Sequence, residues 1–369
     1  MAAPRPPVTV ALRVGLDGLA MAAVDRELEI RARRDAPNPP ATAPWPAIDG
    51  HHVWRWILAV LEDFAERFRV EAVVPTADPR TVALTDGRHL LAAMMRPDAR
   101  PPAALRAAFV AAAPRPDRSG RPVDEAETTT ALQLFWLQHV QPEIFTRARW
   151  VLPHGNWWGF RLSDGVPAGE ASSLVAGGHL AECPSARPST LARRQGWQLL
   201  LPALREPHRL LGRIAPAIAA HTGLATDTAV LVGGADLLVA HALILAAGFD
   251  RAALVLVGDG CLLVPGTTTP DAGHRVLASL DRRRVVQTTL PADAAALTAR
   301  LDDLGHAGPV VVAGAWAGTR ALAAARAARD QAVFAIDDDA LWARGAALLA
   351  HWGRRPALPR LAIRRVGAD

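Results

Sequence analysis

The sequence contains no lysine and no tyrosine, and the missing lysine shapes its charge. All 41 residues counted as Lys or Arg are Arg, so the sequence pI is about 10.7 although the formal net charge is only +5. Apart from short groups at residues 282–284 and 364–365, the Arg residues are scattered along the chain. A nucleic-acid surface gathers basic residues on one face or interleaves them with aromatics. We therefore attribute the high pI to composition bias and expect no nucleic-acid partner.

Cysteine and long apolar runs are also scarce. Cys183 and Cys261 are the only two cysteines, and they lie far apart with no CxxC spacing, so the sequence supports neither a disulfide framework nor a zinc site. The longest apolar stretch, residues 237–249, contains His241 and is too short to span a bilayer. The first seven residues lack the apolar core of a signal peptide. We therefore expect a cytoplasmic protein that does not associate with membranes.

The chain is long enough for two domains. It has 369 residues, of which 50% are hydrophobic, and this is sufficient for two ordinary cores. Residues 8–14 and 19–24 flank a glycine turn and predict a β-hairpin, with a third strand over 27–34. Apolar residues from Val53 to Phe68 recur at helical spacing. We predict a further helix over 210–220 that ends at Gly223, and we place the boundary there, giving an N-terminal domain of residues 1–222 and a C-terminal domain of 223–369.

The second half of the sequence alternates between strands and helices. Strands are predicted at 229–232, 254–257, 262–264, 310–312 and 333–336, and helices at 236–247, 317–329 and 340–352. Such alternation is typical of an α/β domain with its own core. Neither GxGxxG nor GxxxxGK[ST] occurs in the sequence. We therefore expect a duplicated architecture that clamps a nucleotide between two halves, and not a single Rossmann sheet.

Several short motifs occur in a fixed order over nearly the whole chain. They are W-L at 136–137, P-E at 142–143, R-L-S-D-G at 161–165, E-A-S-S at 170–173, T-G-L at 222–224, G-G-A-D at 233–236 and V-V-V-A-G-A at 310–315. In order and spacing the chain resembles the FGGY carbohydrate kinases, as a shortened and degenerate member. The resemblance implies a two-domain, actin-like (ribonuclease H-like) ATPase fold of the α/β class, in which ATP and a sugar meet in the cleft between the domains.

The G-G-A-D motif matches the segment that carries the catalytic aspartate of that family. By this resemblance Asp236 is the general base that accepts the proton of a substrate hydroxyl, while Mg²⁺ and backbone N–H groups stabilise the phosphates of ATP. A structural interpretation remains open, because Asp is also favoured as the N-cap of a helix and a helix is predicted to start here.

The first phosphate loop of the family, D-x-G-T, is poorly preserved. A gapless alignment places Arg13 and Leu16 on its Asp and Thr, with Gly15 retained, and so puts a cation where the metal-organising acid belongs. A shifted alignment uses Asp17 and Gly18, which restores an acid but shortens the turn. We favour the gapless alignment, and both remain open.

The other nucleotide loops are preserved to different extents. The second phosphate hairpin becomes Gly258, Asp259, Gly260 and Cys261, and a carboxylate there repels a triphosphate unless a metal lies between them. Asp259 and Gly260 also make a good hairpin turn with no role in binding. Gly314, Ala315 and Gly318 resemble the adenine-side loop of the family. No set of metal ligands can be assigned.

The sugar-side motifs are only partly kept. The resemblance places six candidate substrate-binding residues in them: Asp78, Arg80, Asp98, Arg100, Asn156 and Trp157. For Asp98 and Arg100 a solvated loop is the alternative, and for Trp157 it is packing in the core. The acidic run at 337–339 precedes a predicted helix, so capping explains it at least as well as metal binding.

Two functions follow from these patterns. The first is an ATP- and Mg²⁺-dependent kinase that phosphorylates a ketose, a polyol or a related hydroxylated molecule. The second is a catalytically impaired pseudokinase that serves as a binding or regulatory scaffold, because its phosphate loops are degenerate. If the chain self-associates, a homodimer is the expected assembly.

Overall fold

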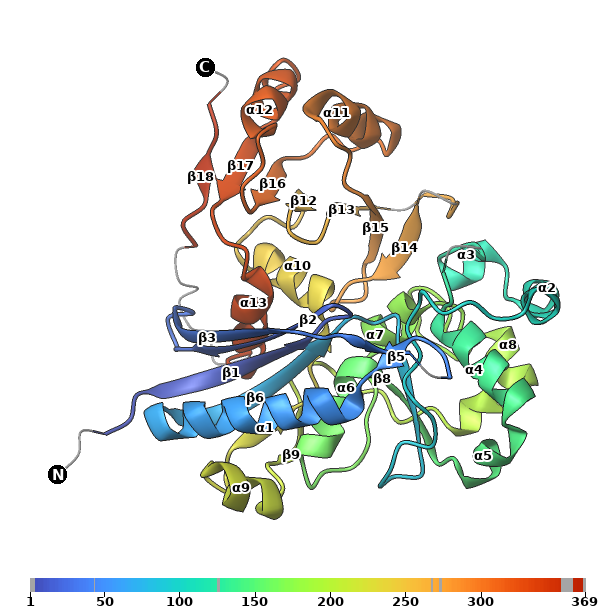
Figure 1. The fold of residues 1–369 in the computed structure, drawn as a ribbon. Coiled ribbons are helices and arrows are strands. Elements are labelled where there is room, and N and C mark those ends of the chain that lie inside the picture. The colour runs from blue at the N-terminus through green and yellow to red at the C-terminus, as the bar shows by residue number, and fades with distance from the viewer. Residues whose placement is uncertain are drawn as a thin grey trace.

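The computed structural model describes residues 4–42, 44–124, 127–266, 268–271, 274–352 and 361–367. Two mixed β-sheets dominate the architecture, with helices on their outer faces and a helical layer between them (Figure 1). A helical region, labelled α2 to α5, α7 and α8, extends to one side of the first sheet.

The first sheet contains seven strands in the order β3-β2-β1-β6-β10-β9, and β11 pairs with β6 as well. The β1–β2 hairpin is confirmed, with Val14 opposite Leu19 in the antiparallel register. β1, β10 and β11 all run parallel to β6. The bounds are β1 (Pro7–Val14), β2 (Gly18–Val24), β3 (Ile30–Pro37), β6 (Arg69–Ala77), β9 (Leu210–Arg213), β10 (Ala229–Leu231) and β11 (Gly234–Ala235).

The outer face of this sheet is covered by α1 (Gly50–Arg67), α6 (His154–Leu162) and α9 (Pro216–Thr222). The predicted first helix is confirmed as α1. Asp49 caps it by accepting hydrogen bonds from the backbone N–H groups of His51 and His52, each at 3.0 Å. The apolar stripe of α1, which includes Ile57, Leu61 and Phe64, is buried against the sheet.

The second sheet also contains seven strands, in the order β14-β15-β13-β12-β16-β17-β18. Its outer face packs on α11 (Ala294–Asp303) and α12 (Thr319–Ala327). The strands predicted near 254, 262, 310 and 333 are confirmed, whereas β14, β15 and α11 were not predicted. The bounds are β12 (Ala253–Leu256), β13 (Cys261–Pro265), β14 (Arg275–Ala278), β15 (Arg284–Thr289), β16 (Val310–Ala313), β17 (Val333–Ile336) and β18 (Arg364–Arg365).

Two helices, α10 (Asp236–Ala246) and α13 (Leu341–Ala350), fill the space between the sheets. Both are apolar around most of their circumference, as expected for helices that are buried on two sides. They cross closely at Gly345, where a Cβ atom would lie 2.3 Å from the carbonyl oxygen of Val239. One core therefore joins the two sheets through these helices.

The region beside the first sheet is largely helical. Residues 97–122 include α2 (Ala103–Ala112) and α3 (Pro116–Ser119), and Phe109 is fully buried. The remaining elements are α4 (Thr130–Val140), α5 (Pro142–Arg147), α7 (Ala171–Gly177), α8 (Thr190–Arg194), a 3₁₀ turn at Trp197–Leu199, and two small sheets, β4 (Pro40–Ala41) with β5 (Ala47–Ile48) and β7 (Val82–Thr85) with β8 (Trp150–Pro153).

The helix predicted over 210–220 is wrong in its first half, since residues 210–213 form β9 and only 216–222 are helical. Both β9 and β10 belong to the first sheet, and the chain passes to the second sheet between Ala235 and Ala253. No helix in the described part of the chain is long and apolar enough to cross a membrane.

Candidate active site

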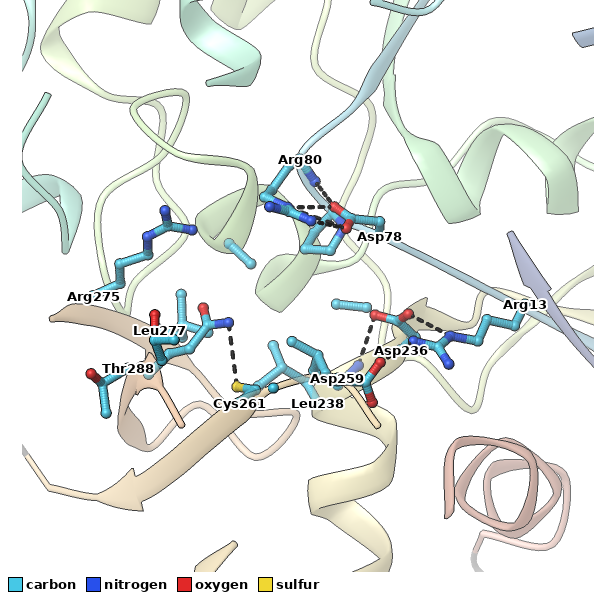
Figure 2. A pocket seen from close by; sticks show the side chains of 17 residues that line it. Arg13, Asp78, Arg80, Asp236, Leu238, Asp259, Cys261, Arg275, Leu277 and Thr288 are labelled. Atoms are coloured by element: carbon cyan, nitrogen blue, oxygen red, sulfur yellow. Dashed lines mark hydrogen bonds and ion pairs between the residues drawn. The ribbon is translucent and has the colours of Figure 1, made fainter. Parts of the chain in front are cut away.

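A cavity of about 390 Å³ lies between the two sheets. The first sheet contributes residues from β1 and from the end of β6, and the second contributes the β12–β13 hairpin, β14 and β15 (Figure 2). The N-terminus of α10 forms part of its wall. The polar and charged side chains that line it are Arg13, Asp78, Arg80, Asp236, Asp259, Arg275, Gln287, Thr288 and Thr289.

Asp236 enters this cavity because of how β11 pairs with β6. Gly234 and Ala235 lie beside Thr76 and Ala77 in parallel register, so Asp236 and Asp78 are each the next residue after a paired strand end. The turn before β11 requires glycine at 233, where φ is +71° and a Cβ atom would lie 1.8 Å from the carbonyl oxygen of Pro75. The backbone therefore fixes the position from which the Asp236 side chain enters the cavity.

Asp236 is buried and faces mixed charges. Burial raises the pKa of its carboxyl, and the negative charges of Asp78 and Asp259 act in the same direction, while Arg13 opposes them; the net shift is upward. Ala235, and not Asp236, occupies the N-cap position of α10. One Asp236 oxygen accepts a hydrogen bond from the backbone of Leu237 at 2.8 Å, and the other turns toward Arg13. The capping interpretation thus accounts for only one of the two oxygens.

Arg13 projects from β1 between two carboxylates. Its Nε donates to Oδ2 of Asp236 at 2.8 Å and its Nη2 donates to Oδ1 of Asp259 at 2.5 Å. Its guanidinium carbon also lies 6.0 Å from the ring centroid of Trp342. Burial acts to lower the pKa of Arg13, but the two carboxylates outweigh it and raise the pKa. Arg13 is therefore a permanent cation at the position that the gapless alignment assigns to an acid.

Asp17, the alternative acid of the shifted alignment, does not line the cavity that contains Asp236 and Arg275. Its side chain is 86% exposed and accepts a hydrogen bond from Arg96 at 2.8 Å. Arg96 also donates to the carbonyl oxygen of Leu16 at 2.5 Å, and Asn38 donates to that of Gly15 at 2.8 Å. These contacts fasten the β1–β2 turn to its surroundings.

A wider hollow of about 640 Å³ adjoins the main cavity on the side of this turn. It is lined by Gly15, Asp17 and Gly18 from the β1–β2 hairpin and by Gly258 and Asp259 from the β12–β13 hairpin. The two predicted phosphate loops therefore face each other across one space, as the resemblance implies. Gly260 lines the main cavity.

The adenine-side candidates lie apart from these residues. Gly314, Ala315 and Gly318 form the loop between β16 and α12, and none of them lines either hollow. Gly318 packs under Trp316, whose ring would lie 2.7 Å from a Cβ atom at that position. A packing role accounts for this glycine.

Asp78 and Arg80 form a tight pair in the cavity wall. Arg80 Nε donates to both Asp78 oxygens, at 3.0 and 3.1 Å, and Nη2 donates at 2.6 Å. Burial acts to raise the pKa of Asp78, but Arg80 outweighs it and the pKa is lowered. His154 contacts the Asp78 carbonyl oxygen at 3.2 Å, and burial lowers the pKa of this imidazole to about 4. Asp78 is thus ionised and His154 neutral.

Asp98 and Arg100 do not line the cavity. Asp98 accepts a hydrogen bond from Arg96 at 3.1 Å, and Arg100 donates to the carbonyl oxygen of Ala99 at 3.3 Å. Both residues are exposed, which agrees with the alternative interpretation of a solvated loop.

Asn156 and Trp157 are also outside the cavity. The Asn156 amide donates to the carbonyl oxygen of Val232 at 2.9 Å and accepts from the backbone N–H of Glu170 at 3.0 Å, so it ties α6 to the turn before β11. Trp157 is 2% exposed within the core of the first sheet. Both side chains are therefore engaged in packing and hydrogen bonding away from the cavity.

Several cavity residues were not anticipated from the sequence. Arg275, Gln287 and Thr288 come from β14 and β15. The β-branched residues of R-V-V-Q-T-T over 284–289 are the only sequence signal for β15. Gln287 donates to Sγ of Cys261 at 3.5 Å, and burial raises the pKa of that thiol to about 12, which keeps it protonated and unreactive near neutral pH.

The carboxylates of the cavity do not form a metal site in this arrangement. Asp78 is paired with Arg80, and Asp236 and Asp259 are both paired with Arg13. Over the described ranges, no group of three or more His, Cys, Asp or Glu is placed to hold a metal ion. The residues present therefore do not fit Mg²⁺ held directly by the protein.

Comparison with known proteins places the fold. No family model matches the sequence. No curated protein matches it either. Among solved structures, a carbohydrate kinase from Novosphingobium aromaticivorans aligns with a TM-score of 0.85 at 20% identity, over 99% of this chain and 95% of that one. A xylulose kinase from Rhodospirillum rubrum (TM-score 0.78, 17% identity) and a gluconate kinase from Lactobacillus acidophilus (0.76, 11%) each align over 98% of this chain and 94% of theirs. The chain therefore has the carbohydrate kinase fold, and the predicted actin-like α/β fold class is confirmed.

Proposed function

We propose that this chain is a carbohydrate kinase homologue that transfers phosphate from ATP to a hydroxyl of a ketose, polyol or related small molecule. The observation that carries the proposal is the position of Asp236: a buried carboxylate with a raised pKa, at the end of a strand, in the wall of a cavity between two sheets. A carboxylate in such a site is a stronger base than one in water.

In this mechanism Asp236 acts on a hydroxyl group of the substrate. The hydroxyl proton passes to a carboxylate oxygen of Asp236 while the hydroxyl oxygen attacks the γ-phosphorus of ATP. The bond between that phosphorus and the departing ADP oxygen breaks, and a phosphate ester forms. The hydrogen bonds from Leu237 and Arg13 hold the carboxylate in one orientation before the reaction. The resemblance and the fold support ATP as the donor.

A second function is favoured by the ion pairs of Arg13. Arg13 forms ion pairs with both Asp236 and Asp259. The carboxylate of Asp259 also places a negative charge beside the hollow where a triphosphate would lie. A protein with this arrangement binds a sugar or polyol without transferring phosphate, and serves as a scaffold or as a partner of an active homologue. The two functions differ in whether ADP is produced.

The deciding experiment is calorimetric titration with ATP, with and without Mg²⁺, followed by measurement of ADP release. The panel contains xylulose, gluconate, glucitol and glycerol, because the similar structures include kinases named for a ketose and for a sugar acid. In an active kinase, Asp236→Asn lowers turnover by about 10²- to 10⁴-fold, the usual contribution of a general base. Asp117→Asn is the matched control, since Asp117 is paired only with exposed Arg115 in the described chain.

The outcomes separate the two functions. Sugar-dependent ADP release that is lost in Asp236→Asn and kept in Asp117→Asn supports the kinase. Sugar binding without nucleotide binding or ADP release rejects the kinase and supports the scaffold. If neither a sugar nor ATP binds, both proposals fail.

A further inference from the structure

Two further Arg side chains line the cavity. Arg275 enters it from β14 and lies on the side opposite Arg13 in Figure 2, whereas Arg80, from the segment after β6, lies beside Asp78. Their side chains are 28% and 36% exposed, so each guanidinium is partly open to the cavity. The proposed mechanism uses neither residue.

These cations share one buried carboxylate. Glu127 is 5% exposed and accepts hydrogen bonds from Arg121 and, at 2.5 Å, from Arg275 Nη2. Arg80 Nε lies 4.0 Å from the other Glu127 oxygen and is also paired with Asp78. Three guanidinium groups thus face two carboxylates, which leaves one excess positive charge on this side of the cavity.

Arg121 is the most deeply buried of the three cations, with a side chain that is 2% exposed. Burial is the main cause that lowers the pKa of this guanidinium to about 10, and the neighbouring charges of Arg275 and Arg80 lower it further, against the effect of Glu127. At the opposite end, Arg13 alone faces the carboxylates of Asp236 and Asp259. The cavity therefore has a positive end and a negative end.

We propose that the substrate is a polyhydroxylated molecule with one anionic end, such as an aldonate, which lies with its anion at Arg275 and Arg80 and a hydroxyl at Asp236. This inference rests on the proposed function of the same cavity. A guanidinium has five donors, and the contact with Glu127 occupies Nη2 of Arg275, so the group retains the capacity to bind a second carboxylate.

The space between the two ends suits such a molecule. Gln287, Thr288 and Thr289 line the cavity and offer amide and hydroxyl groups to the hydroxyls of a polyol. A volume of about 390 Å³ lies within the range of small-molecule sites. An anion at Arg275 and Arg80 pairs directly with the excess positive charge on that side of the cavity, which a neutral polyol does not.

The test compares three six-carbon ligands by calorimetry on the full chain, without nucleotide: D-gluconate, D-glucitol and D-glucitol 6-phosphate. Gluconate and glucitol differ only in whether carbon 1 carries a carboxylate or a hydroxyl. We expect gluconate to bind at least about tenfold more tightly than glucitol at low ionic strength, and the ratio to fall as salt screens the partly exposed cations. The phosphate ester distinguishes the source of the anion: tighter binding of gluconate assigns a carboxylate, and tighter binding of the ester assigns a phosphate.

Two substitutions test whether Arg275 causes the preference for gluconate over glucitol. Arg275→Gln removes the charge and should bring the affinities for gluconate and glucitol to within about twofold of each other. Arg275→Lys keeps the positive charge but loses the planar pair of N–H donors that a guanidinium offers to a carboxylate. It should therefore keep the preference for gluconate at lower affinity. The exposed residue Arg364 provides the control substitution Arg364→Gln, which should leave the ratio unchanged. Circular dichroism confirms that each variant is folded, and the salt dependence of the unsubstituted protein tests the charge if Arg275→Gln does not fold.

Failure of this inference is distinguishable from failure of the proposed function. If glucitol binds as tightly as both anionic ligands at low salt, or if folded Arg275→Gln keeps the full preference, the anionic substrate is wrong, while sugar binding in the cavity stands. If none of the three ligands, xylulose or glycerol binds, the proposed function fails and this inference fails with it.

Discussion

Arg13 and Asp236 form an ion pair at 2.8 Å that links the central part of the first sheet to the first residue of α10. Through Asp259 the same guanidinium also reaches the β12–β13 hairpin of the second sheet. One side chain therefore connects three elements around the cavity.

Substitution of Arg13 by Gln should lower the free energy of unfolding at pH 7. The change leaves the carboxylates of Asp236 and Asp259 together without a cation, and the pKa of Asp236 rises further because Arg13 is the group that lowers it. Since Arg13 is partly exposed, solvent screening reduces the usual cost of breaking a buried pair to about 2 kcal/mol. Urea unfolding at pH 7 measures this loss.

The pH dependence of that loss has a definite sign. A carboxyl whose pKa is raised by folding disfavours the folded state increasingly as the pH rises from its ordinary value near 3.8 toward the raised value. The deficit of Arg13→Gln should therefore be smallest in acid and grow toward neutral pH. Arg115→Gln, which removes the exposed pair with Asp117, should change stability by less than about 0.5 kcal/mol. Equal losses in the two variants would contradict a special role for Arg13.

Substitution of Asp259 by Asn should strengthen ATP binding if the nucleotide enters the hollow between the two hairpins. The change removes a negative charge near the phosphates and leaves Arg13 with one partner fewer. We expect an increase in affinity of about five- to tenfold at low ionic strength, which becomes smaller as salt is added. Titration calorimetry of Asp259→Asn against Asp250→Asn, an exposed position, measures the difference. Unchanged affinity would show that the triphosphate does not pass Asp259.

The parts of the fold with strong local patterns could be predicted from the sequence. The β1–β2 hairpin follows from its glycine turn, and α1 from its apolar stripe and the Asp49 cap. Residues 210–213 were misread because a short apolar run fits a strand and a helix equally well. Strand β14 has only four residues and was missed for the same reason.

The candidate site was predictable only where one segment determines it. Asp236 follows from a turn and a strand that are close in sequence, and the structure places it in the cavity wall. Arg275 lies 148 residues from its partner Glu127, so no local pattern indicates their contact. Asn156 and Trp157 were chosen from their position in a family motif, but Asn156 is hydrogen-bonded to the backbone and Trp157 is packed in the core. Only the three-dimensional packing shows this.

Substitution of Gly233 by Ala should be far more damaging than the same change at Gly223. Both residues have φ near +70°, so each variant loses about 1 kcal/mol by forcing alanine into the left-handed region. At Gly223 no atom lies within 4 Å of the added Cβ, whereas at Gly233 it overlaps the carbonyl oxygen of Pro75. We expect Gly233→Ala to lose more than about 3 kcal/mol or to fail to fold. Thermal and urea unfolding measure both variants, and similar losses would contradict the role of Gly233 in positioning Asp236.

Stability should fall as the pH drops below about 6.5, because three buried histidines are neutral in the folded state. Burial lowers the pKa of His154 and His241 to about 4 and that of His179 to about 3. The unfolded chain binds protons at the ordinary value near 6.5, so stability is full above that value and is lost as the pH falls toward the folded values. Melting temperatures between pH 7.5 and 4.5 record the loss.

The variant His241→Gln isolates one of these groups. The wild-type unfolded chain binds one proton at His241 that the folded chain does not, and the variant lacks this site. The slope of the free energy of unfolding against pH between 6 and 4.5 should therefore become shallower by up to about 1.4 kcal/mol per pH unit. His51→Gln, at an exposed position on α1, is the control and should leave the slope as it is. An unchanged slope in His241→Gln would show that His241 binds its proton equally well in the folded and unfolded states, which contradicts the lowered pKa.

The direct pairing of β6 with β11 sets the separation between the Asp78 and Asp236 backbones. Thr76 and Ala77 pair with Gly234 and Ala235 at one interstrand spacing, about 4.8 Å, and each aspartate follows directly after one of these paired strands. The backbone therefore brings the two acids close together whatever side chains surround them. Substitutions nearby change which cations lie beside the two acids, and hence which acid carries the proton, more readily than they change where the two acids are attached.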